Sequence, residues 1–490
     1  MANAEHVRLL LSPGWPRWRS ENPRIIPDLV EAELAGRDLR GADLSRALLT
    51  RADLTGADLT GANLANAEIE GVFLSGAVLD GASCTGVRFD LLEIRNCSLK
   101  GAVFAGATFR GADFSGSDLS RANLAQVNLE AAVLDGVNLG GADLTGASLR
   151  GARLDRASLA GATLVGAILE GVNLAGNDLG GADLREAEAT RIQLPGANLA
   201  GAKMLKAKMR EANFLRADLR GADFDGADVS HATFRLANLE AARLTNCDAQ
   251  AADFREAMLL HTELAGVQMA AAQLSGVDFR SPKLGRLSLV RANLTGATFV
   301  GCNLRGFRFE QARMEGADLR EANLEAAKLD GAILTGANVR GSRLRQSSLV
   351  GAVAIDADLS GCDLILADLS GGDFTRADLR FSRLVGANCR RASFRFADCR
   401  KADFSKANVG RANFWGALIG GAQMPVAALH WRIGRAITAL LTAGQRKRQQ
   451  REKREQERRI RDTVRLVREI EENDPRLRRQ AARSARAPQP

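Results

Sequence analysis

The chain has 490 residues, of which 46% are hydrophobic and 26% charged, so it can bury a large core and is not a disordered polyelectrolyte. Its formal net charge is +9. No window approaches the ~20 apolar residues of a membrane-spanning helix, and no signal peptide is recognisable, so the sequence predicts a soluble, cytoplasmic protein without a transmembrane segment.

Residues 1–27 hold two of the four tryptophans, Trp15 and Trp18, and four of the ten prolines. They precede a repeat array, and the first unit of such an array leaves backbone groups unpaired unless something covers them. We expect this segment to form an N-terminal cap with buried tryptophans. A partner-binding motif is the alternative.

A five-residue repeat occupies residues 28–424. Its centre is a large apolar residue, and stepping by five from Leu29 to Met424 gives 80 centres without one insertion or deletion. Three of these centres are Ala and three are Cys. Alanine usually lies two residues before the centre, with a small polar residue, mostly Asp or Asn, between them. Such self-similarity at a fixed period determines the fold class.

A period of five fits neither an amphipathic helix nor a flat strand. In a helix, five residues turn the chain by roughly 500°, so successive centres would spread around its surface. In a straight strand, residues five apart point to opposite faces. All centres and alanines point inward only if the chain bends once per repeat. Glycine is frequent two residues after the centre, where such a bend needs a permissive backbone.

The period alone leaves the number of sides per coil open. Fifteen of the nineteen phenylalanines occupy centres, and several pairs are 20 residues apart, as in the runs Phe214–Phe234–Phe254 and Phe374–Phe394–Phe414. A coil of four repeats would stack such pairs vertically. It would place pairs that are 10 residues apart on opposite walls.

The tandem motif A-(D/N)-L-x-x, as in the stretch from Gly41 to Leu64, resembles the pentapeptide repeat family. The resemblance covers about four-fifths of the chain. It implies an all-β solenoid, a right-handed quadrilateral β-helix with one repeat per side and about 20 coils.

Three groups of residues depart from the alanine column. We expect them to kink or widen the coil, and a binding site at one of them is the alternative. The groups are Val87, Leu92 and Cys97; Ile192 with Pro195; and Thr262, Pro282, Leu287 and Phe307. Apolar residues at outward positions hint at a contact surface, mainly toward the end of the array: Phe73, Ile355, Ile365, Leu366, Val385 and Trp415.

Residues 425–444 break the five-residue register, and Pro425 starts a pattern with helical spacing. We expect an amphipathic C-terminal helix that covers the last coil or joins two copies into a homodimer. The apolar face that would make these contacts comprises Val426, Leu429, Ile433, Ile437, Leu440 and Leu441.

Residues 445–490 are predicted to form a basic helix and a disordered tail. Residues 425–490 contain 18 basic and 8 acidic residues, a net charge of +10, whereas residues 28–424 carry −3. The tail is suited to nucleic acid or an anionic membrane surface; a solvated helix with internal salt bridges is the alternative. Candidate basic contacts are Arg446, Lys447, Arg448, Arg451, Arg458 and Arg459.

No catalytic or metal-binding constellation accompanies the repeats. All seven cysteines fall in inward columns, where they pack as small apolar residues, and the four histidines are scattered. We therefore expect no enzyme activity, no metal and no cofactor.

The leading hypothesis is a non-enzymatic scaffold that binds a protein partner through a rigid rod. The alternative is a DNA mimic that inhibits a type II topoisomerase, like the quinolone-resistance branch of the family. The charge of −3 on the repeats is far below a phosphate-like density of one charge per ~1.7 Å. A module that targets anionic surfaces through residues 445–490 is the third hypothesis.

Overall fold

The computed structural model describes residues 2–285 and 287–425. The chain divides into two units, Met1–Gln423 and Met424–Pro490, and almost all described residues belong to the first. The candidate contacts of the predicted C-terminal helix and of the basic tail lie outside the described part. These two segments, with the homodimer and the anionic partners assigned to them, stay predictions.

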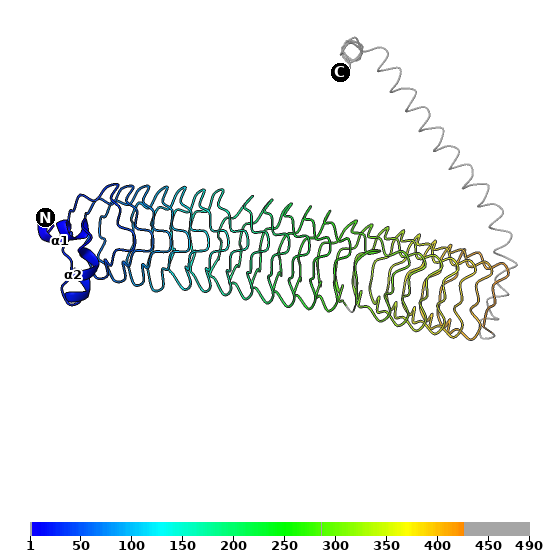
Figure 1. Cartoon of the computed structure of the whole chain (residues 1–490). Coiled ribbons are helices and arrows are strands. Elements are labelled where there is room, and N and C mark those ends of the chain that lie inside the picture. Colours follow the sequence, from blue (N-terminus) through cyan, green and yellow to red (C-terminus); the bar gives the residue numbers. More distant parts are fainter. Residues whose placement is uncertain (1, 286, 426–490) are drawn as a thin grey trace, which may run out of the picture. The chain divides into compact units, whose positions relative to one another are not determined.

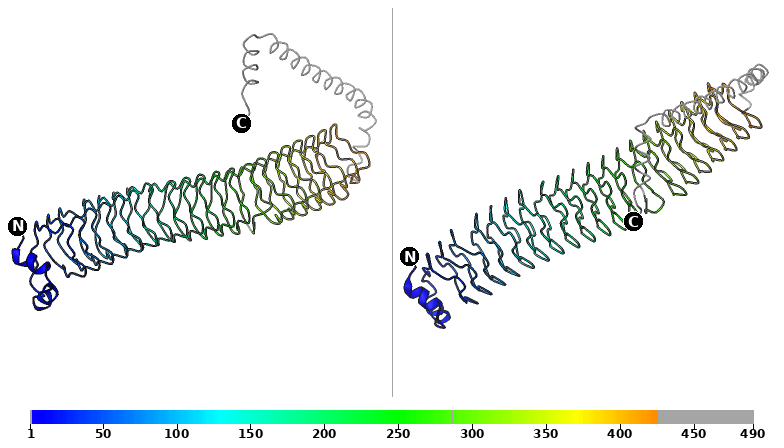
Figure 2. Two further views of the ribbon diagram at one scale, coloured as in Figure 1. Left: turned by 45° about the horizontal axis from the view of Figure 1, so that its top comes forward. Right: turned by 90° about the horizontal axis from the view of Figure 1, so that it is seen from above.

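Residues 28–423 form a stack of four-sided coils that a parallel backbone ladder holds together (Figure 1). Isolated parallel bridges pair the residue before a centre with the residue 20 positions later, from Asp28 with Leu48 to Asp403 with Gln423. Twenty residues are four repeats, so each repeat makes one side of a coil. The coils of this unit follow one another along a single long direction (Figure 2).

One repeat shows why the sequence takes this form. Ala142 and Leu144 are fully buried, and the Leu144 N–H donates to the Thr163 carbonyl of the next coil (2.7 Å). The Ala147 N–H donates to the Leu144 carbonyl (3.0 Å) and closes a β-turn in which Gly146 has φ +63°. A positive φ at the third residue is typical of a type II turn, where glycine is favoured. The predicted bend is confirmed.

Many corners nevertheless carry residues other than glycine. Arg46 has φ +61° and Leu91 has φ +62° at this position. A non-glycine residue in the left-handed region costs about 1–2 kcal/mol. The ladder and the core must therefore hold these corners in place.

The Asp or Asn before each centre also has a structural role. The Asp143 Oδ1 atom accepts hydrogen bonds from the Thr145 N–H (3.0 Å) and the Thr145 hydroxyl (2.6 Å). This Asx turn satisfies a backbone donor at the bend. Asparagine adds a bond between coils, as where Asn138 Nδ2 donates to Asp118 Oδ1 (3.1 Å). The frequency of Asp in this column thus needs no catalytic explanation.

Phenylalanine rings pack in the core as their spacing predicts. Phe214 and Phe234 stack with ring centroids 4.8 Å apart, and Phe234 and Phe254 follow at 4.7 Å. Phe224 comes from the opposite wall and meets Phe214 edge-on, with centroids 5.7 Å apart. The four-repeat coil suggested by the 20-residue spacing is confirmed.

The first coil has no preceding coil, so its carbonyls need other donors. Two short helices precede it: α1, Ala4–Leu10, and α2, Trp15–Glu21 (Figure 1). The Trp15 indole N–H donates to the Asp43 carbonyl (3.2 Å), and the Arg19 guanidinium donates to the Ser45 carbonyl (3.3 Å). Trp15 is only 2% exposed. Side chains from the N-terminal segment thus replace donors that a further coil would supply.

Carboxylates of the Asx turns couple the fold to pH. Hydrogen bonds from Thr55 and Thr60 hold the pKa values of Asp53 and Asp58 below their usual range, and those from Arg40 lower the pKa of Asp38 to about 2. The unfolded chain therefore binds more protons than the folded chain between about pH 4 and about pH 2. We expect the urea midpoint to be steady above about pH 5 and to fall through this window.

A matched variant separates titration from other acid effects. Asp53→Asn combined with Asp58→Asn keeps the Asx acceptors but removes two titrating groups. The midpoint of this variant, followed by circular dichroism, should fall less steeply on acidification. An identical slope for the two proteins would contradict the assignment.

Candidate functional site

The regular ladder is interrupted at two places. Within residues 2–285 and 287–425, four pairs lack the expected bridge: 68 with 88, 73 with 93, 258 with 278, and 283 with 303. The first two pairs lie beside the group around Val87, and the last two lie beside the group around Pro282. The predicted local distortion is therefore confirmed for these two groups.

The predicted kink is not found at Ile192 and Pro195. Gln193 keeps its bridges to Asn173 and Asn213, so the ladder is continuous there. Ile192 is fully buried, which shows that the core at this level has room for the larger side chain. Pro195 lies outside the alanine column, and its carbonyl still accepts the Gly176 N–H (2.9 Å).

Pro282 explains the second interruption. In a regular repeat, the residue at this position donates its N–H to the centre carbonyl three residues earlier, as Ala142 does to Leu139 (3.0 Å). Proline has no N–H, so the turn after Phe279 cannot close in this way. The Phe279 carbonyl keeps a donor in the Cys302 thiol of the next coil (3.2 Å).

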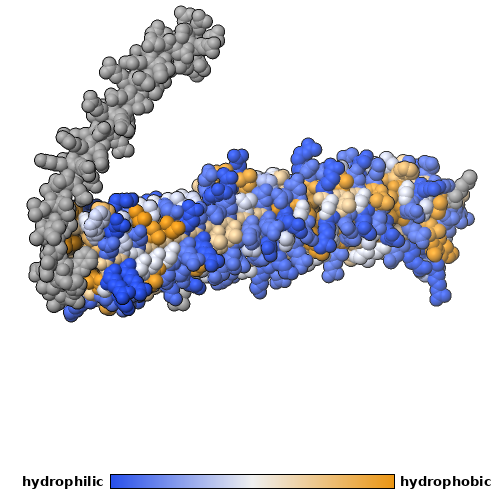
Figure 3. Space-filling view, turned by 180° about the vertical axis from the view of Figure 1, so that it is seen from behind, coloured by the Kyte–Doolittle hydropathy of each residue, from blue (hydrophilic) through white to orange (hydrophobic). Residues whose placement is uncertain are grey.

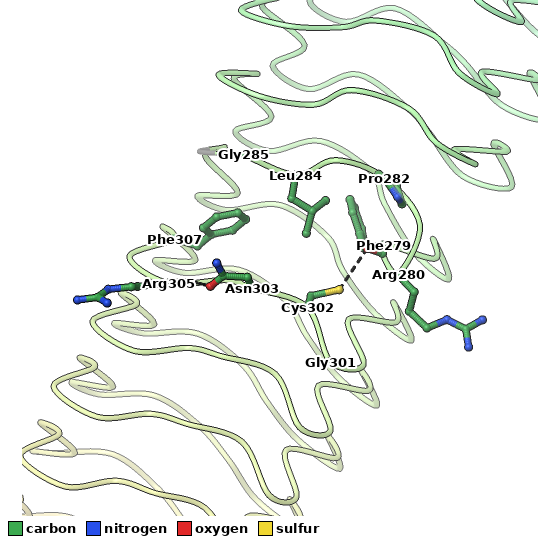
Figure 4. A pocket seen from close by; sticks show the side chains of 10 residues that line it. All are labelled: Phe279, Arg280, Pro282, Leu284, Gly285, Gly301, Cys302, Asn303, Arg305 and Phe307. Carbon is green, nitrogen blue, oxygen red and sulfur yellow. Dashed lines mark hydrogen bonds between the residues drawn. The ribbon is translucent and has the colours of Figure 1, made fainter.

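A hollow of about 590 Å³ opens where the turn is lost. Leu284, Phe307 and Cys302 point into the space between the successive coils, whereas Arg280 and Arg305 extend away from it (Figure 4). The remaining lining residues are Phe279, Pro282, Gly285, Gly301 and Asn303. We call this hollow the coil opening.

Both arginines at the rim are already paired. Arg280 contacts Asp278 at 2.6 Å in its own repeat, and Arg305 lies 3.6 Å from Glu325. The coil opening is therefore lined by both polar and apolar groups, and among its described lining residues the two arginines already have carboxylate partners. Leu284 and Phe307 supply the apolar part of this lining, and no lining arginine is left free to bind an anion.

The thiols give no sign of nucleophilic chemistry. Burial raises the pKa of Cys302 to about 11, with a further rise from Asp278, and burial raises the pKa of Cys84 to about 12. All seven cysteines are free. Inward polar side chains commonly donate to the centre carbonyl 23 residues earlier, as Cys362 does to Val339 (3.0 Å). The role of the cysteines is therefore packing and local hydrogen bonding.

A family model gives the same picture as the geometry. The model described as "Pentapeptide repeats" matches overlapping stretches that together span 28–91, 94–235, 237–270, 272–371 and 373–411. These stretches cover well over half of the chain. The chain belongs to the pentapeptide repeat family. Proteins of this family are right-handed quadrilateral β-helices.

Several solved pentapeptide repeat proteins are similar to this one. HetL of the cyanobacterium Nostoc sp. strain PCC 7120, involved in heterocyst differentiation regulation, is 27% identical; the match covers 53% of this chain and 89% of HetL, with a TM-score of 0.26. QnrB1, a plasmid-mediated fluoroquinolone resistance protein, is 18% identical over 49% of this chain and 95% of its own, with a TM-score of 0.23. No curated protein matched.

Apolar side chains form separate patches on an otherwise polar pentapeptide repeat surface (Figure 3). Of the outward apolar residues picked out in the sequence, Phe73, Leu366 and Trp415 are exposed, whereas Ile355, Ile365 and Val385 are half-buried. The sequence analysis missed the exposed residues Met258, Leu260, Phe381 and Phe396. Reading every outward column, corners included, could have found them.

Two kinds of feature are not found in the described ranges. Residues 2–285 and 287–425 contain no cluster of His, Cys, Asp or Glu that could hold a metal ion. The helices of the same ranges are all too short or too polar to cross a bilayer.

Replacing Pro282 tests the cause of the coil opening. In Pro282→Ala, the new N–H can donate to the Phe279 carbonyl, so we expect slower amide exchange across 279–304 by hydrogen–deuterium exchange. Pro195→Ala, where the ladder is continuous, is the control and should leave exchange unchanged. Unchanged exchange in Pro282→Ala would mean that Leu287 and Phe307 alone hold the coils apart.

Thiol labelling reports on access to the same place. Cys302 is half-buried, whereas the other six cysteines are buried. A small maleimide should therefore modify Cys302 first in the native protein, as mapped by peptide mass spectrometry. In Cys302→Ala, native labelling should drop to the background of the buried thiols. Earlier labelling of any other cysteine would show that the coils open elsewhere.

Proposed function

We propose that the protein is a non-enzymatic scaffold that binds a protein partner at the coil opening. The observation that carries this proposal is a hollow of about 590 Å³ beside exposed apolar side chains. Met258 is 55% exposed and Leu260 is 42% exposed, one coil before the hollow. Apolar groups held at a concave site on a polar surface favour a binding role.

The chemistry of the coil opening indicates the kind of partner segment. The interior contributed by Leu284 and Phe307 would accept a large apolar side chain. The missing bridge between residues 283 and 303 leaves strand edges without their regular partner. An extended peptide could form hydrogen bonds with these strand edges and bury one apolar side chain in the hollow.

The arrangement of charges on the rod gives little support to the alternative of a DNA mimic that inhibits a topoisomerase. Carboxylates are neutralised by arginines in their own repeats, as where Arg380 lies 2.5 Å from Asp378 and Arg400 lies 2.5 Å from Asp398. A wall built from such pairs presents no continuous negative charge. Inhibition of gyrase supercoiling by sub-micromolar protein would nevertheless reverse this ranking.

Site-specific photocrosslinking tests the proposal in the full chain. A photoreactive amino acid at position 260 should capture a defined partner in cells, identified by mass spectrometry. The same group at position 350, where Val350 is also exposed (42%), is the matched control and should not capture it. Phe307→Glu, which places a charge in the hollow, should reduce the captured amount by about tenfold.

The contribution of the tail is measured separately. Ending the chain at Gly444 should leave capture at position 260 unchanged. Capture that disappears with this truncation and with moderate salt would contradict the proposal, because the rod would then act only as a spacer for a basic tail.

A further inference from the structure

A second surface lies near the end of the coils and is not part of the coil opening. Phe396 is 40% exposed and Trp415 is 50% exposed, and their rings meet edge-on with centroids 4.7 Å apart. The Phe396 ring lies over Gly416 of the next coil, where a side chain would come within 2.5 Å of the ring. The glycine at this corner thus leaves room for the ring.

An arginine lies across both rings. The Arg395 guanidinium carbon is 5.1 Å from the Trp415 centroid and 5.8 Å from the Phe396 centroid. Both distances fall within the range of a cation–π contact. The two rings, whose planes are inclined at 70°, and the guanidinium together form one cluster with aromatic and cationic parts.

Three arginines of this region have no carboxylate partner among the described residues. In the described part of the chain, no carboxylate forms an ion pair with Arg391, Arg395 or Arg411. Residues 391–396 and 411–416, which form this wall in two successive coils, contain no Asp or Glu. Arg391 and Arg411 occupy the same corner one coil apart, a spacing of ~4.8 Å. Arg380 and Arg400, in contrast, each pair with an Asp of their own repeat.

We propose that Arg391, Arg395, Phe396, Arg411 and Trp415 form a binding site for single-stranded nucleic acid, which we call the arginine–aromatic patch. Unstacked bases stack on exposed aromatic rings, and phosphates bind unpaired guanidinium groups. A duplex offers the phosphates but keeps its bases stacked, so the rings favour a single strand.

An anionic membrane is a less suitable partner for this patch. Membrane insertion requires apolar rings that protrude together. Here Arg395 lies over the rings, and Ser393 and Asn413 occupy the wall between them and the corner arginines. Residues 445–490 add basic charge without any aromatic residue, so their attraction for polyanions would not distinguish a single strand from a duplex.

Binding of a fluorescent oligonucleotide of about 20 nucleotides to the full chain tests the proposal. By anisotropy, Trp415→Ala should weaken single-strand binding by at least about fivefold and duplex binding by less than about twofold. Arg395→Ala should weaken it as well and reduce the slope of log K against log salt by about 0.7, whereas Trp415→Ala should leave that slope unchanged. A loss of fold would not produce this division.

Matched controls come from the same rod. Phe73→Ala removes an exposed aromatic ring (60% exposed), and Arg216→Ala removes an exposed corner arginine; both should bind like the parent protein. Equal single-strand binding by the parent, Trp415→Ala and Arg395→Ala would overturn the proposal. Loss of binding to phosphatidylserine vesicles in these variants, with oligonucleotide binding unchanged, would also overturn it and assign the patch to a membrane surface. Neither result affects crosslinking at position 260.

Discussion

The structure depends on one constraint, the backbone ladder that joins each repeat to the repeat four places later. The ladder needs each residue to meet the residue 20 positions on, so one insertion would shift every later column by one position. The centre leucines would then lose their inward position. This explains why the five-residue register runs from Leu29 to Met424 without a slip. The Asx turns and the positive-φ corners shape the bends that bring each repeat into register with this ladder.

The regular part of the fold could be predicted from the sequence, because few backbone paths keep a centre such as Leu144 and its alanine inward at a period of five. The candidate sites were only partly accessible. The sequence shows that Pro282 lacks the N–H that closes the turn. The size of the hollow, however, depends on how Leu284 and Phe307 pack between the two coils. A large side chain in the alanine column does not by itself predict a break in the ladder, since Ile192 is fully buried in the core. Phe396 depends on Gly416 of the next coil, a relation visible only once the coil has four sides.

The two proposed surfaces have one thing in common: each lies where the sequence departs from the repeat pattern. At the coil opening, an inward position has lost its backbone donor. At the arginine–aromatic patch, outward positions carry rings and unpaired guanidinium groups in place of small polar residues. On the regular walls between them, many polar groups bond within the rod, as Asp378 does with Arg380 of its own repeat. Departures from local consistency are where functional residues are expected in a repetitive fold.

The interruption near Pro282 also bears on how the rod unfolds. In a solenoid, each coil is stabilised mainly by its two neighbours, so cooperativity passes from coil to coil through the interfaces between them. The missing bridges at 258 with 278 and at 283 with 303 weaken such interfaces in the second half of the array, and those at 68 with 88 and at 73 with 93 do so near its start. The coils on the two sides of an interruption are therefore coupled to each other less tightly than neighbouring coils of an uninterrupted stretch are. We therefore expect the rod to unfold in more than one cooperative step, with boundaries at its interrupted interfaces.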